Sequence, residues 1–141
     1  MKISAEIGVI ATSNNILVER LSDEYAKVIR KKIVEKYLDS QPRAFLWETF
    51  KEAAVIEDCN GWKKLCDFVG DNRCIMFFDD GEDDAMLVIN DGNALYKLLS
   101  EMFGFEFYIT NFKTNYVLCF NHHDCLVGCG TAAEWIKPLI R

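Results

Sequence analysis

The sequence predicts a single α+β domain in which helices cover one face of a mainly antiparallel sheet of about five strands. Its 141 residues match the commonest size of one domain, and half of them are hydrophobic, enough for a substantial core. From residue 60 onward, the apolar periodicity gives the order α-β-β-α-β-β-β-α. The short connections between strands permit only antiparallel neighbours. No repeat or linker divides the chain, so we expect residues 1–141 to form one domain.

The first third of the chain contains one clear element. Residues 1–10 have apolar spacings that fit either a strand or a helix. Residues 16–38 carry an apolar side chain at about every fourth position, which predicts one long helix, and Pro42 lies where that helix must have ended. Residues 44–50 are rich in aromatic side chains and favour a strand, and a short helix is the alternative.

The next elements are a helix, a hairpin and a second helix. Residues 62–69 have helical apolar spacing, with Asp58 or Asn60 as the candidate N-cap and Gly70 as the residue after the helix. The apolar runs 73–78 and 85–89 predict a hairpin. The polar segment 90–93 is expected to cap a following helix, which carries a leucine stripe and ends before Gly104.

Three strands and a short helix complete the prediction. The strands are expected in the apolar runs 105–110, 116–120 and 125–129. Thr131 and Glu134 have the spacing of a capping box, in which each residue accepts a hydrogen bond from the backbone of the other. They predict a helix start at Thr131, and Pro138 ends that helix.

Charge and cysteine content limit the partners and the compartment. The net charge of -6 disfavours nucleic acid and anionic membranes, which are polyanions, and favours a basic protein partner. The N-terminus lacks the apolar stretch of a signal peptide, and no apolar run could span a membrane. We therefore expect a cytoplasmic protein whose six cysteines are reduced.

Five carboxylates lie within six positions of the predicted hairpin turn. Their order does not match the calcium-loop pattern. The simplest interpretation is a solvated turn whose charges discourage pairing with other sheets. The alternatives are a magnesium site and a surface that attracts a basic partner. The candidate partner-binding residues are Asp79, Asp80, Glu82, Asp83 and Asp84.

The two histidines of the chain are adjacent, in the predicted turn 121–124. A four-residue loop pairs Phe120 with Cys125 and Cys119 with Leu126, which directs the two cysteines to opposite faces of the sheet. Zinc needs its ligands to converge at about 2 Å from one point. We therefore expect no metal site and no cofactor.

A cysteine–histidine nucleophile is the enzymatic alternative. Either His122 or His123 could activate Cys119 or Cys125, with Asp124 or Asn121 orienting the imidazole. All of these residues lie in one short stretch, whereas a catalytic pair needs side chains that converge across a pocket. We therefore expect no catalytic residue here and interpret the histidines as parts of a turn.

The C-terminal half resembles a group of small bacterial proteins of unknown function. The similarity lies in Glu106-Phe107-Tyr108, an acid and two aromatics on a strand, followed by the turn Asn121-His122-His123-Asp124 and a glycine-containing strand. Some proteins of this size and acidity look like immunity partners of bacterial toxins. The resemblance implies a binding role and no catalytic residues.

The sequence therefore favours a non-enzymatic protein-binding module. Its most specific form would be an immunity-type protein that masks a basic toxin domain. A small enzyme that uses His122 or His123 with a nearby cysteine is the first alternative. A domain whose role lies in homo-oligomerisation is the second, and the oligomeric state itself is left open.

Overall fold

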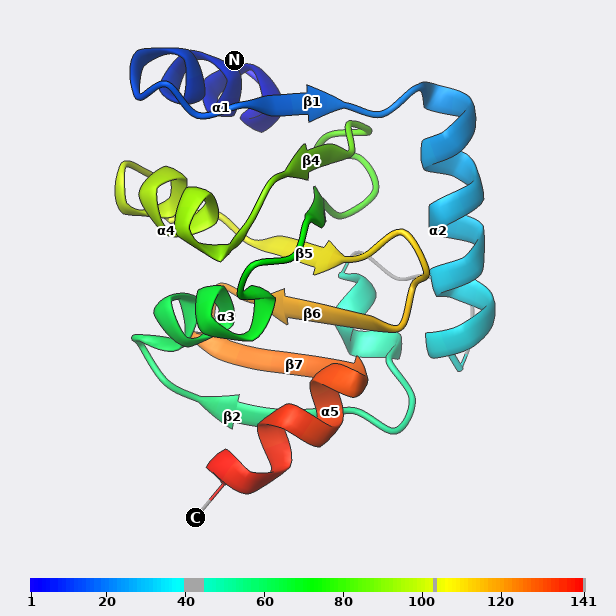
Figure 1. The fold of residues 1–141 in the computed structure, drawn as a ribbon. Coiled ribbons are helices and arrows are strands. Elements are labelled where there is room, and N and C mark those ends of the chain that lie inside the picture. Colours follow the sequence, from blue (N-terminus) through cyan, green and yellow to red (C-terminus); the bar gives the residue numbers. More distant parts are fainter. Residues whose placement is uncertain (40–44, 103, 141) are drawn as a thin grey trace.

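The computed structural model describes residues 1–39, 45–102 and 104–140, and its strands form one antiparallel sheet. Across this described part the order is β1-β4-β3-β5-β6-β7-β2 (Figure 1). The α+β prediction is confirmed, with seven strands instead of about five. The strands are β1 (Val18–Arg20), β2 (Ala54–Glu57), β3 (Cys74–Phe77), β4 (Leu87–Ile89), β5 (Phe107–Thr110), β6 (Tyr116–Phe120) and β7 (Cys125–Gly130).

Helices flank the sheet, and the two termini lie at its opposite ends (Figure 1). Within the described residues, no helix is long and apolar enough to cross a membrane. The helices are α1 (Ile3–Ser13), α2 (Asp23–Tyr37), α3 (Gly61–Val69), α4 (Gly92–Ser100) and α5 (Thr131–Ile136), with 3-10 turns η1 (Leu46–Thr49) and η2 (Lys137–Leu139).

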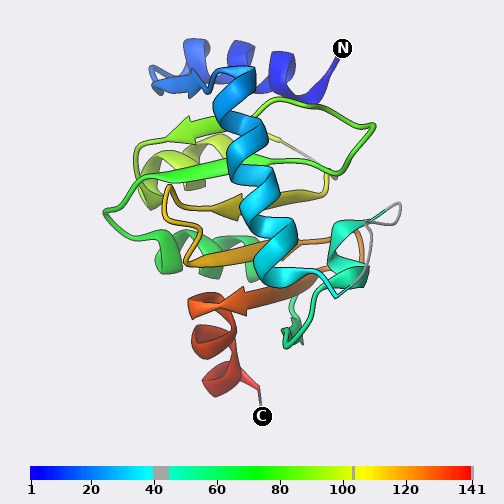
Figure 2. The ribbon, with the colours of Figure 1, turned by 90° about the vertical axis from the view of Figure 1, so that its right-hand side faces the viewer.

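The helices cover both faces of the sheet, whereas we expected them on one face. α2 crosses in front of the strands in Figure 2, and it buries Ala26, Ile29 and Ile33 against one face. The helices α1, α3, α4 and α5 pack on the other face. The central strands explain this arrangement, because every residue of β3 and β5 is buried. A strand buried on both faces must have a layer on each side.

Both additional strands lie at the edges of the sheet. The predicted helix over residues 16–38 was wrong at its start, because Val18–Arg20 pairs with β4 as strand β1. Helix α2 begins after Ser22, whose hydroxyl accepts a hydrogen bond from the backbone N–H of Tyr25. Pro42, expected beyond the end of this helix, lies outside the described residues. Strand β2, also unexpected, pairs with β7. Each of these strands has three or four residues, which is too short for a clear alternation.

Several local predictions are settled by the backbone. The ambiguous segment 1–10 forms a helix from Ile3 onward, and the segment around Trp47 is a 3-10 turn and not a strand. The β3–β4 hairpin is confirmed. Asp91 caps α4 by accepting from the N–H of Ala94 at 2.8 Å. The predicted helix start at Thr131 was correct, but the predicted capping box was wrong. The N-cap of α5 is Gly130, which has a positive φ of 66° and makes no side-chain cap hydrogen bond.

Close packing of α3 against α4 depends on Gly92. A Cβ atom at this position would lie 2.1 Å from the backbone oxygen of Cys66 on α3. The N–H of Gly92 also donates to the oxygen of Gly70 at 2.7 Å, and Gly70 ends α3 with a φ of 59°, as expected. The two helices therefore lie side by side, where they form one wall of the pocket described below (Figure 1).

Candidate functional site

The turn that carries the histidines is one residue longer than expected. Phe120 pairs with Leu126, and Cys119 pairs with Val127, so the predicted register was wrong by one residue. Asn121 produces this turn, because its side-chain oxygen accepts from the N–H groups of His123 at 2.9 Å and of Cys125 at 3.1 Å. Asp124 adopts a left-handed φ of 58°. The extra residue places Cys125 on the same face of the sheet as Cys119.

The cysteines near the turn are therefore on one side of the sheet, contrary to the prediction. Cys119 and Cys129 are buried against the layer of α2, and Cys125 packs beside them. Burial, followed by the nearby carboxylates Glu106 and Asp79, raises the pKa of Cys119 far above its ordinary value. Burial also raises the pKa of Cys125. These thiols are protonated at neutral pH and are poor nucleophiles.

Glu106, just before β5, holds the first histidine of the turn. Its Oε1 atom lies 2.9 Å from Nδ1 of His122 and accepts from the backbone N–H of His122 at 3.2 Å. The indole N–H of Trp47 donates to the same oxygen at 3.1 Å. The Glu106 side chain is 11% exposed and that of His122 is 45% exposed. A buried carboxylate therefore orients a half-exposed imidazole.

Asp79 lies in the same buried network and connects η1 to the sheet. Its Oδ1 atom accepts from the hydroxyl of Tyr108 at 2.7 Å and from the N–H of Leu46 at 2.8 Å. The N–H of Trp47 donates in turn to the Tyr108 hydroxyl at 3.2 Å. Burial, followed by the hydrogen bond with Glu106, raises the pKa of Asp79 to about 7. Asp79 is thus part of the interior and not of a solvated turn.

The raised pKa of Asp79 favours a single proton between the side chains of Asp79 and Glu106. The Oε2 atom of Glu106 is buried and has no hydrogen-bond donor when both groups are ionised. Two adjacent carboxylates in a dry environment cannot both carry a charge at low cost. In the hydrogen bond between the two side chains, protonated Asp79 is then the donor and Glu106 the acceptor.

The five acidic residues of the β3–β4 turn do not form one surface. Asp83 is buried and accepts from the N–H groups of Ser4 at 2.8 Å and of Ala85 at 3.0 Å. Asp80 is exposed and pairs with Arg30 of α2 at 3.1 Å. The exposed acids of the turn are Asp80, Glu82 and Asp84.

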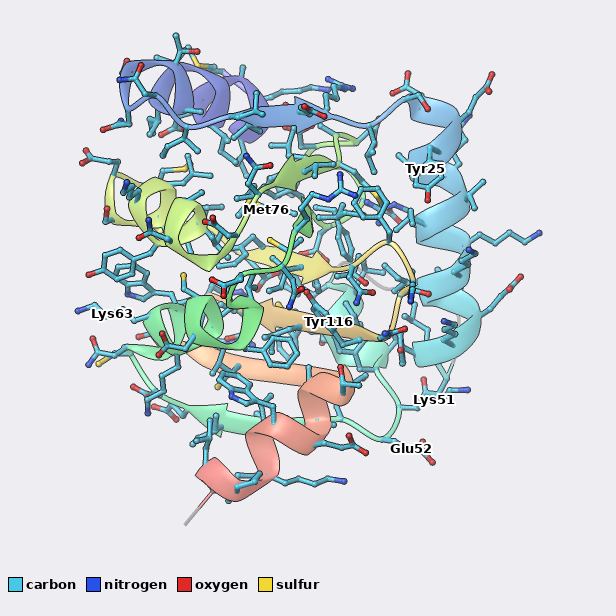
Figure 3. All side chains as sticks on the ribbon, in the orientation of Figure 1. Tyr25, Lys51, Glu52, Lys63, Met76 and Tyr116 are labelled. Atoms are coloured by element: carbon cyan, nitrogen blue, oxygen red, sulfur yellow. The ribbon has the colours of Figure 1, made fainter. Side chains whose placement is uncertain are left out.

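A pocket of about 610 Å³ opens where the turn meets α3 and α4. On the helix side, the rings of Trp62 and Tyr96 stack with centroids 5.5 Å apart. Lys63, labelled in Figure 3, extends from the same helix end. Phe107 and Phe120 line the pocket on the sheet side, and His122 lies on its wall.

His122 connects the two faces of the sheet at this end. One ring nitrogen bonds to Glu106 in the layer of α2, and the same side chain lines the pocket in the layer of α3 and α4. Its ring packs at 4.9 Å from that of Phe45. The His123 ring lies 4.0 Å from that of His122 and 6.1 Å from that of Trp47, but His123 is not among the residues that line the pocket.

The site residues expected from the sequence are thus brought together in part. His122 and Asp124 line the pocket, whereas Cys119 is buried on the other side of the sheet. Within the described part of the chain, no group of three or more His, Cys, Asp or Glu side chains could hold a metal ion. From the sequence we predicted no role for Glu106. The feature that could have indicated one is a single acidic residue within the apolar run 105–110.

Fold and site together define a three-layered α+β protein with an aromatic pocket beside a histidine turn. The chain belongs to a family of unknown function, DUF6756, whose model matches residues 2–139. No curated protein and no solved structure matches the chain.

Proposed function

We propose that this protein is a non-enzymatic protein-binding module, and that it recognises its partner with the aromatic pocket and the histidine turn. The observation that carries the proposal is the pocket itself, whose wall includes an imidazole held in one orientation by a buried carboxylate. A concave site of this size with aromatic walls and a few fixed polar groups is typical of recognition. The thiols near the imidazoles are protonated, so catalysis by them is disfavoured.

The rigidity of the turn supports a binding role. Asn121 fixes its backbone through two hydrogen bonds, and Glu106 fixes the ring and the backbone of His122 through two more. A surface ordered before the partner arrives loses little conformational entropy on binding.

The partner is proposed to be basic. The net charge of -6 gives the protein an overall negative potential, which speeds association with a positively charged protein. Asp80, Glu82 and Asp84 contribute exposed charges in the β3–β4 turn. They would steer the partner, and the pocket would anchor it. In its most specific form, the proposal is an immunity-type protein that masks the active surface of a basic toxin domain.

Tyr96 and Tyr25 offer a matched test. Their side chains are comparably exposed, at 42% and 40%, but Tyr96 lines the pocket and Tyr25 lies on α2 on the other face (Figure 3). A protein that is captured from lysate by the wild type, and less by Tyr96→Ala, is identified and purified. Its affinity is then measured by titration calorimetry.

Tyr96→Ala should weaken binding at least tenfold, as loss of an aromatic anchor does, and Tyr25→Ala should leave it unchanged. Equal affinity of the purified partner for both variants would exclude the pocket as its binding site. Light scattering of the free protein separates partner binding from self-association, the remaining alternative.

A small enzyme is the second candidate, favoured by the pairing of His122 with Glu106. Among the described residues this pairing leaves Nε2 of His122 without a hydrogen-bond partner, as in a general base oriented by a carboxylate. Cys59 is the exposed thiol that lines the same pocket. Alkylation of Cys59 at neutral pH, measured in the wild type and in His122→Ala, tests this candidate. An activated thiol reacts more slowly in the variant, and equal rates would eliminate it.

A further inference from the structure

We propose that the pocket binds a neutral, planar aromatic group that carries an N–H or O–H donor, such as an indole or a phenol, and that this donor bonds to Nε2 of His122. The inference rests on the proposed function in one respect: the aromatic group is a Trp or Tyr side chain of the protein partner. It adds to that function the chemical class of the group that enters the pocket.

The acceptor follows from the tautomer of His122. Oε1 of Glu106 is a carboxylate oxygen that only accepts, so Nδ1 of His122, 2.9 Å away, must carry the proton. Trp47 and the backbone of His122 donate to the same oxygen, which prevents the carboxylate from turning away. In the neutral ring, Nε2 then holds a lone pair and accepts hydrogen bonds. His122, a residue of the pocket wall, thus offers an acceptor nitrogen that Glu106 does not occupy.

The planar aromatic character follows from the walls. Trp62 and Tyr96 stack at an interplanar angle of 24° on the helix side. Phe105, Phe107 and Phe120 line the sheet side. Aromatic rings add favourable stacked and edge-to-face geometries to the burial of their area. The volume of about 610 Å³ accommodates a two-ring group and lies within the usual range of ligand pockets.

The neutral character follows from the charges at the pocket. Of the residues that the structure describes, one cation and one carboxylate line it, Lys63 and Asp124, and a His122 ring with its proton on Nδ1 alone adds no charge. The Lys63 ammonium lies 5.5 Å from the centre of the Trp62 ring and is engaged there. With these charges opposed, the pocket offers no net attraction for a charged ligand. A hydroxyl or ring N–H is therefore the polar group that fits.

Indole and benzofuran are the probes, because they share shape and area and differ in the ring N–H. Proton–nitrogen NMR titrations of the full chain give both dissociation constants and show which residues respond. We expect indole to bind about five- to tenfold more tightly than benzofuran, the value of one hydrogen bond. His122→Phe should abolish the difference, and His123→Phe, the matched control, should retain it.

The inference is overturned if pocket residues do not respond to indole, or if the two probes bind the wild type with equal affinity. Long-range proton–nitrogen spectra of the wild type read the His122 tautomer directly, so the test does not depend on the folding of a variant. A proton on Nε2 instead of Nδ1 would equally contradict it.

N-acetyltryptophanamide separates the source of the group from its chemistry. Binding of this compound supports a protein side chain, and its exclusion while indole binds would overturn the assignment to a partner's tryptophan. A purified partner that inserts an aliphatic residue would overturn the inference and leave the proposed function standing. If indole binds but the protein is shown to have no protein partner, the proposed function fails and the aromatic specificity of the pocket stands.

Discussion

The hydroxyl of Tyr108 donates a hydrogen bond to Oδ1 of Asp79 over 2.7 Å, and both residues are buried. Asp79 also accepts from the backbone of Leu46, and Tyr108 accepts from that of Trp47. Two residues of the sheet layer thus fix the backbone of η1. The same turn supplies the indole that bonds to Glu106, so this pair controls the position of His122 as well.

Removing the hydroxyl in Tyr108→Phe should destabilise the protein by about 1–3 kcal/mol, because buried Asp79 loses one of its hydrogen bonds and the backbone N–H of Trp47 loses its acceptor. Urea denaturation measures the loss. The control is Tyr25→Phe at an exposed position, which should change the free energy of unfolding by less than about 0.5 kcal/mol. Equal effects of the two substitutions would show that the network contributes nothing.

The pH dependence of stability follows from Asp79. Its pKa is about 7 in the folded protein, against an ordinary value of 3.8 that applies to the unfolded chain. Between these values the folded state binds more protons than the unfolded state, so this group makes the free energy of unfolding fall as pH rises from about 4 to about 7. Its contribution is fully present below about pH 4 and is lost as pH passes through about 7.

Asp79→Asn removes this titration and keeps a polar side chain beside Glu106. The stability of the variant, measured by denaturation between about pH 5 and 8, should decline less over that interval than that of the wild type. The change isolates Asp79 from the other titrating groups, which both proteins share. A wild type and a variant with parallel profiles would disprove the raised pKa of Asp79.

Packing of α3 against α4 gives a prediction at Gly92. A methyl group there would lie 2.1 Å from the oxygen of Cys66, and the backbone would have to move. We expect Gly92→Ala to destabilise the protein by about 1–3 kcal/mol, the usual cost of overpacking. Gly8→Ala is the matched control, because no atom lies within 4 Å of its added carbon in α1. It should stabilise by up to about 1 kcal/mol, and both values come from thermal or urea unfolding.

The sequence predicted the elements that local chemistry defines. Asp91 caps α4 by its own side chain, and the hairpin of β3 and β4 follows from two apolar runs joined by a polar turn. The edge strands β1 and β2 escaped prediction because each depends on a distant partner, β4 for one and β7 for the other. Their own residues are too few and too exposed to produce a clear pattern.

The site was predicted less well than the fold, and the reason is the register of one hairpin. The prediction that His122 lies in a turn was correct. The residue types around it are compatible with a turn of four residues and with one of five, so the sequence did not determine the length of the turn. The extra residue decides which face Cys125 joins. The network of Asp79 and Glu106 joins residues far apart in the chain, and no local spacing indicates that they meet.

Asn121 is the residue that sets this register, and Asn121→Ala tests its role. The buried side-chain oxygen accepts from the N–H groups of His123 and Cys125, and alanine would leave both donors unsatisfied. We expect the amides of these residues to exchange with deuterium much faster in the variant, and stability to fall by about 1–3 kcal/mol. Asn93→Ala, at an exposed position of α4, should alter neither amide. Unchanged exchange at His123 and Cys125 would mean that backbone pairing of β6 with β7, and not Asn121, fixes the turn.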